Sequence, residues 1–114
     1  MDKWFYAFVF LFIVLIGGTL NVVVMDANDC KMPVTSEYPE RYPTACYYSV
    51  ESPQDANLGY LADIIKFRTN KAIHYFSIGD ILAISGGLCL TYILVLIAIQ
   101  FNKAKKIEKN IKTN

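Results

Sequence analysis

The sequence predicts an all-α membrane protein, in which two transmembrane helices form an antiparallel hairpin joined by a structured external loop with a short amphipathic helix. Two uncharged apolar runs, Trp4–Met25 and Ile81–Phe101, are the basis of this prediction. At about 1.5 Å per residue, each run is long enough to cross a hydrocarbon core of roughly 30 Å. In the second run, Leu, Ile, Val and Phe side chains outweigh the polar Thr91 and Gln100. Both runs are therefore expected to span the membrane.

The two runs divide the chain into four segments. We expect a first transmembrane helix over residues 1–25, an external loop rich in tyrosine and proline over residues 26–76, a second transmembrane helix over residues 77–102, and a basic cytoplasmic tail over residues 103–114. The loop and the tail are too short for an autonomous enzyme core, because a domain of that size is only marginally stable by itself. The protein is therefore not expected to be an enzyme.

Lysines after the second run predict the orientation in the membrane. Five of them stand against a single acidic residue, Glu108, in the tail: Lys103, Lys105, Lys106, Lys109 and Lys112. Because basic residues near span ends stay in the cytoplasm, both termini of a two-span chain are placed there, with residues 26–76 outside the plasma membrane. Three basic residues before the second run favour the opposite orientation but are outnumbered: Lys66, Arg68 and Lys71.

The first run also has features of a secretory signal, since Lys3 precedes a long apolar stretch. Two features argue against cleavage: the run is longer than the usual apolar core of a signal, and Val24–Ala27 is a poor small-residue cleavage site. We expect the run to be retained as a helix.

Small residues mark the faces on which the two helices are expected to pack. Gly17, Gly18 and Asn21 interrupt the first run, and the second run carries a stripe with a spacing of four: Gly79, Ala83, Gly87 and Thr91. Small residues allow close helix contact in lipid. In an antiparallel hairpin Gly17 and Gly87 have nearly matched depths, and Asn21 lies level with Ala83. A face for another subunit, or no packing role, are the alternatives.

Ser77-Ile78-Gly79-Asp80 matches a capping box at the start of the second helix. In such a box the Ser77 hydroxyl accepts a bond from the backbone N–H near Asp80, and the Asp80 carboxylate bonds back. A carboxylate there also interacts favourably with the positive end of the helix dipole. The alternative is a proton or ion relay through Asp80 at the membrane edge.

The external loop contains all four prolines and, up to Pro53, is expected to form turns and extended pieces. Leu58, Leu61 and Ile65 fall on one helical face, with Ile64 beside them. A short amphipathic helix on the outer membrane surface is the favoured interpretation, and an edge strand is the alternative.

The cysteines and the single histidine offer no metal site. Cys30 and Cys46 both lie in the external loop, where two thiols are expected to form a disulfide worth roughly 3 kcal/mol. Cys89 lies within the second run as a small apolar residue, and His74 is expected to be an interfacial polar residue. No CxxC pair or paired histidine accompanies the cysteines, so neither a metal nor any cofactor is expected.

Four short segments resemble one family of small bacterial integral membrane proteins, a domain of unknown function. They are Leu20–Asn21, Asn28–Val34, Leu61–Ile65 and Phe76–Leu82. Members of that family show Asn-Gly-Gly-Arg-Met-Pro-Val after a helix, then Leu-Gly-Asp-hydrophobic-Ile-Pro, and Ser-Ile-Gly-Asp opening the last helix. The resemblance covers about residues 16–90 and implies a fold and a membrane location, but no activity.

The chain departs from the family pattern at several positions. Asp29 and Cys30 replace the two glycines of the first motif, Ala62 replaces the glycine of the second, and Lys66 stands where proline is usual. The family also has further helices before the one that matches the first run. The chain therefore resembles a shortened, divergent member, in which the Cys30 and Cys46 pair substitutes for lost rigidity.

The resemblance carries over six polar residues: Asn21, Asn28, Lys31, Asp63, Ser77 and Asp80. Four of these are expected at or just outside the outer membrane surface, where a charge-assisted network would lock the loop over the helix ends. Binding of a ligand or a lipid headgroup by the same residues is the alternative.

No catalytic triad, phosphate loop or nucleotide fingerprint is visible in the sequence. The expected function is that of a non-catalytic accessory or interaction subunit of a membrane assembly, whose partners are the lipid bilayer and other membrane subunits or further copies of the chain. Nucleic acid is excluded as a partner, because the only basic cluster is a short tail beside a membrane. The alternatives are an oligomeric transporter or channel component and a surface module that binds lipid or ligand.

Overall fold

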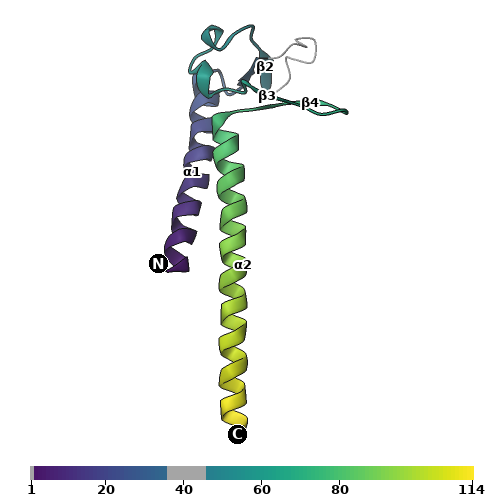
Figure 1. Cartoon of the computed structure of the whole chain (residues 1–114). Helices are drawn as coiled ribbons and strands as arrows, with labels where there is room; N and C mark the ends of the chain where they lie inside the picture. The colour runs from purple at the N-terminus through teal and green to yellow at the C-terminus, as the bar shows by residue number, and fades with distance from the viewer. Residues whose placement is uncertain (1, 36–45) are drawn as a thin grey trace.

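The computed structural model describes residues 2–35 and 46–114, and it shows two long helices with a small head at one end (Figure 1). The molecule measures 71 × 32 × 24 Å along its principal axes. In chain order the elements are α1 (Lys3–Ala27), β1 (Met32–Val34), β2 (Tyr47–Ser49), the 3₁₀ turns η2 (Pro53–Asp55) and η3 (Gly59–Leu61), β3 (Ile65–Arg68), β4 (Ile73–Phe76) and α2 (Ile78–Thr113).

The helices α1 and α2 lie side by side and antiparallel, and α2 extends well past the first residues of α1 (Figure 1). Asp2 begins α1, because its carboxylate accepts a hydrogen bond from the backbone N–H of Trp4 at 3.2 Å. Near this end Lys3 Nζ donates to Gln100 Oε1 of α2 at 2.9 Å. Neither helix contains proline, so each continues without a break.

Both helices are long and apolar enough to cross a membrane, judged by length and composition. In the most apolar stretch of each helix, 11% of the residues are buried. The core helix of a soluble protein would be mostly buried instead. Two apolar helices of this kind are consistent with membrane insertion.

The helix α2 includes the lysine-rich residues 103–113 as well as the second apolar run. One ion pair within this part joins Lys112 Nζ to Glu108 Oε1 at 2.6 Å, at helical spacing i, i+4. Such exposed pairs contribute about 0.3–0.5 kcal/mol. The basic segment is therefore a direct continuation of the second helix.

The head packs on the end of α1 through a small apolar core of Val24, Met32 and Ala62, which are 0%, 5% and 1% exposed. Strand β1 pairs in parallel with β2, with Met32 opposite Tyr47. A single bridge joins Val34 of β1 to Asp63, so three segments of the loop meet beside α1.

The prediction of an all-α fold is wrong, because the head contains two two-stranded sheets. The predicted amphipathic helix near residues 58–65 is also absent. Leu58 has φ 53° in the left-handed region, which interrupts a right-handed helix, and only the 3₁₀ turn η3 follows it. Ile65 instead begins β3, which pairs antiparallel with β4. The β-branched and aromatic residues around Phe67 and Tyr75 favour this hairpin.

The predicted disulfide is not present, since no bond joins Cys30 and Cys46 in the structure and both residues are exposed. Cys30 is the third residue after α1 and has φ 62°, and Cys46 directly precedes β2. A backbone bond from Met32 N to the Cys46 carbonyl, 2.8 Å long, joins the two segments without a sulfur bridge.

Candidate functional site

Asn21, Ser77 and Asp80 form a polar network that joins α1 to the first turn of α2. The Asn21 amide donates to Asp80 Oδ1 at 2.8 Å, and its carbonyl oxygen accepts from Ser77 Oγ at 2.6 Å. Asp80 N donates to Ser77 Oγ at 2.9 Å and Ser77 N donates to Asp80 Oδ2 at 3.0 Å, which confirms the predicted capping box. Ser77 is fully buried. Asn21 of the neighbouring helix therefore supplies the acceptor that its hydroxyl cannot find in water.

The helices approach most closely where Gly17 faces Gly79 and Ala83. A Cβ atom on Gly17 would lie 2.5 Å from the Gly79 carbonyl oxygen and 2.7 Å from the Ala83 nitrogen. Only a residue without a side chain permits this approach of the two backbones. The predicted opposition of Gly17 to Gly87, and of Asn21 to Ala83, is therefore wrong by about one to two helical turns.

Gly86, rather than Gly87, continues the contact along α2. A Cβ on Gly86 would lie 3.0 Å from the side chains of Ile13 and Val14, whereas Gly18 and Gly87 have open space at that position. The reason is helical geometry: at 3.6 residues per turn, Gly86 is rotated by only about 20° from Gly79, but Gly87 by about 80°. Residues spaced by four at every step therefore rotate progressively away from the neighbouring helix.

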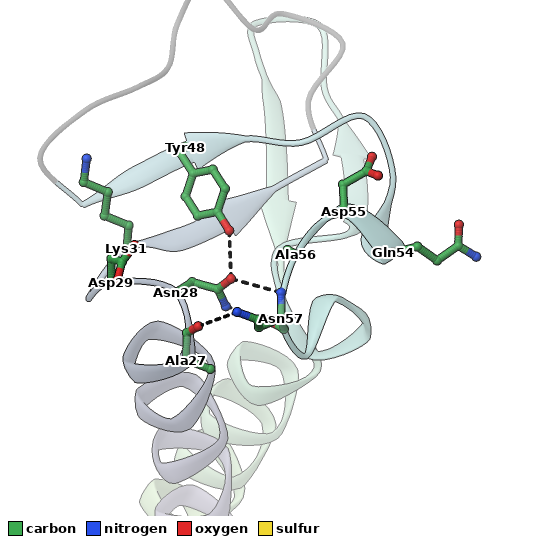
Figure 2. A pocket seen from close by; sticks show the side chains of 9 residues that line it. All are labelled: Ala27, Asn28, Asp29, Lys31, Tyr48, Gln54, Asp55, Ala56 and Asn57. Carbon is green, nitrogen blue, oxygen red and sulfur yellow. Dashed lines mark hydrogen bonds between the residues drawn. The ribbon is translucent and has the colours of Figure 1, made fainter.

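A second polar cluster is centred on Asn28, the residue that ends α1 (Figure 2). Its amide nitrogen donates to the Val24 and Asn57 carbonyls, both at 2.7 Å. Its oxygen accepts from Tyr48 Oη at 2.8 Å and from Asn57 N at 3.1 Å. Asn57 in turn donates to the Ala27 carbonyl at 2.9 Å. This one side chain, 7% exposed, therefore ties two distant loop segments to the helix end.

The two residues after Asn28 have a backbone conformation that favours glycine. Asp29 and Cys30 have φ 55° and 62°, in the left-handed region that favours glycine. Cys30 N donates to the Met25 carbonyl at 2.8 Å, which is the longer bond of a Schellman motif with Asp29 in the position usually held by glycine. These are the two positions at which the resemblance described above has glycine, and the side chains present here introduce backbone strain.

A polar cavity of about 480 Å³ lies beside Asn28 and opens to solvent. Figure 2 shows its lining, which comprises Ala27, Asn28, Asp29, Lys31, Tyr48, Gln54, Asp55, Ala56 and Asn57. Burial and the negative charge of Asp29 raise the pKa of Tyr48, so its phenol stays neutral and donates to Asn28. The Gln54 amide donates to Tyr60 Oη at 3.1 Å, so part of the rim is engaged within the head.

Asp63 is a buried carboxyl group at the junction of the head and the helices. Asp63 is 7% exposed, and its Oδ1 atom has no hydrogen-bond partner, as is also true of Thr35 Oγ1. Burial raises the pKa of Asp63 to about 7, and the negative charge of Asp80 adds to the effect. Its backbone is fixed, because Asp63 N donates to the Pro33 carbonyl and Thr35 N donates to the Asp63 carbonyl, both at 3.1 Å.

The six motif residues do not form one network. Asn21, Ser77 and Asp80 are bonded together, whereas Asp63 is linked to this set only through the negative charge of Asp80, which raises the pKa of Asp63. Asn28 belongs to the second cluster. Lys31 lines the cavity and makes no ion pair with either aspartate, so the expected charge-assisted lock is wrong at this residue.

Sequence reasoning missed Tyr48, Asn57 and Thr35. Tyr48 and Asn57 are 20 and 29 residues from Asn28 in the chain, so no local spacing could indicate their contact. The one sequence feature that could indicate this cluster is the polar side chain of Asn28 at the end of an apolar run, which needs hydrogen-bond partners.

The polar side chains of these clusters are engaged in hydrogen bonds within the chain. Among the described residues, no group of three or more His, Cys, Asp or Glu side chains is arranged to hold a metal ion. Most of the polar atoms around Asn28, Asn21 and Ser77 bond to each other or to the backbone, which fixes the head on the helix ends.

Comparison with known proteins gives one result. No curated protein and no solved structure matches the chain. A family model does match residues 6–94, from α1 across the head and through most of the apolar part of α2. The chain thus belongs to the family of unknown function DUF5317.

Proposed function

We propose that this chain is an integral membrane protein that acts as a non-catalytic interaction subunit of a membrane assembly. The observation that carries the proposal is the exposed apolar surface of the helix pair. Phe8, Phe12 and Leu88 are 68%, 65% and 69% exposed, and many further apolar side chains of both helices resemble them. A contiguous surface of this kind is covered by lipid or by other proteins.

Polar side chains within the helices favour an interaction role over transport. The hydroxyls of Thr19, Ser85 and Thr91 each donate to a carbonyl one turn back in their own helix, at 2.7–2.9 Å. Asn21 is hydrogen-bonded to Ser77 and Asp80. A pathway for ions or polar solutes needs polar groups directed into a channel, and these groups are already satisfied within the chain.

Gly18 and Gly87 support contact with a further helix. Both positions have open space where a Cβ would stand, while Gly17 and Gly86 are filled by the partner helix. Open small positions allow another backbone to approach closely in lipid. Gly17 and Gly86 therefore lie in the contact between α1 and α2, whereas Gly18 and Gly87 lie outside it.

The proposed orientation places both termini in the cytoplasm and residues 26–76 outside the plasma membrane. The lysines of residues 103–112 support it, because they continue α2 beyond its apolar part. Single-cysteine labelling in intact cells, in a background without the native cysteines, should modify a probe at Ser52 but not one at Thr113. Labelling at Thr113 but not at Ser52 would show the opposite orientation and contradict this proposal.

The interaction role is tested by native analysis of the tagged chain, extracted from its membranes in mild detergent. We expect a complex larger than the 12.9 kDa chain, containing other subunits or further copies. Gly87→Leu should reduce the amount of that complex while leaving the packing of α1 on α2 intact. Gly17→Leu is the matched control, because its side chain would push α1 and α2 apart. A monodisperse single chain, unaffected by Gly87→Leu, would contradict the proposal.

A further inference from the structure

The β3–β4 hairpin projects sideways from the end of α2, across the direction of the helix rather than along it (Figure 1). β4 ends at Phe76, and the next residue, Ser77, is the N-cap of α2. The first turns of α2 already expose Ile78 and Ile81, at 41% and 46%. The hairpin therefore lies at the level where the apolar surface of the helix begins.

The two faces of the hairpin differ in chemistry. Residues that are paired across an antiparallel ladder share a face, and successive residues alternate between faces. The register places Ile65, Phe67, His74 and Phe76 on one face, and Lys66, Arg68, Ile73 and Tyr75 on the other. Phe67 is 59% exposed, and the rings of His74 and Phe76 stack at 6.4 Å. The first face is thus apolar and largely aromatic.

The hairpin is also strongly basic. Between Asp63 and Asp80 the chain has no acidic residue but three basic ones: Lys66, Arg68 and Lys71. Thr69 closes the turn through a 2.8 Å bond from its N–H to the Ala72 carbonyl, which places Lys71 at the tip. The charge of this segment therefore complements an anionic surface.

All four residues of β3 are exposed, and the backbone of this strand pairs with β4. A two-stranded hairpin in water is only marginally stable, because it lacks a packed face. A surface that covers the apolar face would supply that support. The exposed apolar surface of α2 begins directly beside the end of this hairpin, at Ile78 and Ile81.

We propose that the β3–β4 hairpin lies on the bilayer leaflet that surrounds this end of α2, with Ile65 and Phe67 at the headgroup level and the basic side chains on anionic phospholipid headgroups. The inference rests on the proposed membrane insertion of α2. Aromatic rings favour the interface, and long basic side chains reach phosphates while their stems stay in apolar surroundings. Each basic residue near an anionic leaflet contributes about fivefold to the docking equilibrium.

The test uses the full chain reconstituted in vesicles of phosphatidylcholine and phosphatidylglycerol, with lipids brominated near the glycerol end of their acyl chains. Trp4→Phe provides a background without tryptophan, and Phe67→Trp, Ile73→Trp and Leu88→Trp are compared in it. Ile73 is the matched control, because it lies on the opposite face of the same hairpin. Leu88 reports insertion of α2.

We expect quenching about threefold stronger at Phe67→Trp than at Ile73→Trp, because the aromatic face is directed into the interface. Replacing phosphatidylglycerol by phosphatidylcholine, or Lys66, Arg68 and Lys71 by glutamine, should weaken the quenching at Phe67→Trp. Equal quenching on both faces, no dependence on charge, or no quenching at Phe67→Trp while Leu88→Trp is quenched would overturn this inference alone. An unquenched Leu88→Trp would overturn membrane insertion as well.

Discussion

Replacing Asp63 by asparagine should remove a dependence of stability on pH. The folded protein holds the Asp63 proton up to about pH 7, whereas the unfolded chain releases it near the ordinary pKa of 3.8. The stabilising contribution of the neutral carboxyl is therefore fully present below pH 3.8 and is lost as pH rises towards 7. A shift of about three pKa units corresponds to about 4 kcal/mol in the free energy of unfolding.

The assay is thermal unfolding of the purified chain in detergent, followed by circular dichroism between pH 5 and pH 8. The melting temperature of the unmodified chain should fall across this interval, since Asp63 must ionise in a buried site beside Asp80. Asp63→Asn should show a flat profile and be the more stable protein at pH 8.

Two controls isolate this group. Glu51→Gln removes an exposed carboxylate from the same head and should leave the slope unchanged. His74→Gln removes the imidazole of the hairpin and should likewise leave the slope unchanged. A slope that survives in Asp63→Asn, or disappears in His74→Gln, would refute the reasoning about Asp63.

Substitutions at five further positions test the packing and the cap, the first four positions by thermal unfolding in detergent and Asp80 by proteolysis. Cys30→Gly should stabilise the chain by about 1 kcal/mol, because it relieves a positive φ, while Cys30→Ala keeps the Cβ and should give no gain. Gly17→Leu should destabilise the helix pair by at least about 2 kcal/mol, whereas Gly87→Leu should stay within about 0.5 kcal/mol. Asn28→Ala leaves two carbonyls, a phenol and an N–H without their partner and should cost about 3 kcal/mol. Asp80→Asn should retain part of the cap that Asp80→Leu abolishes, so greater protease sensitivity of the head in the leucine variant alone checks the capping role.

The helices and the capping box could be predicted from sequence, because their signals are local. A long apolar run without proline determines a helix by itself, and the bonds between Ser77 and Asp80 span only three residues. Small or polar residues in an apolar run also mark Gly17 and Asn21 as contact residues, but the partners predicted for them, Gly87 and Ala83, are wrong. The capping residues then proved to be the partners of Asn21.

The register and the head could not be predicted in this way. The choice of Gly87 over Gly86 followed a spacing of four, and a small rotation per turn decides which of the two meets α1. Leu61 and Ile65 fit a helical period, but Ile65 gains a strand partner in Phe76 that no short window contains. Tertiary pairing therefore overrides the local pattern in the head.

The uninterrupted course of α2 has a mechanical consequence. A single helix of 36 residues is about 54 Å long, and it connects the Ser77 cap to Thr113 without proline or an internal break. Contacts with α1 hold this helix from the Ser77 cap, through Gly86, to Gln100, where Lys3 donates to it, and the lysine-bearing turns extend past α1 (Figure 1). A tilt of the helix pair by a few degrees relative to the head would therefore displace those turns by several ångströms.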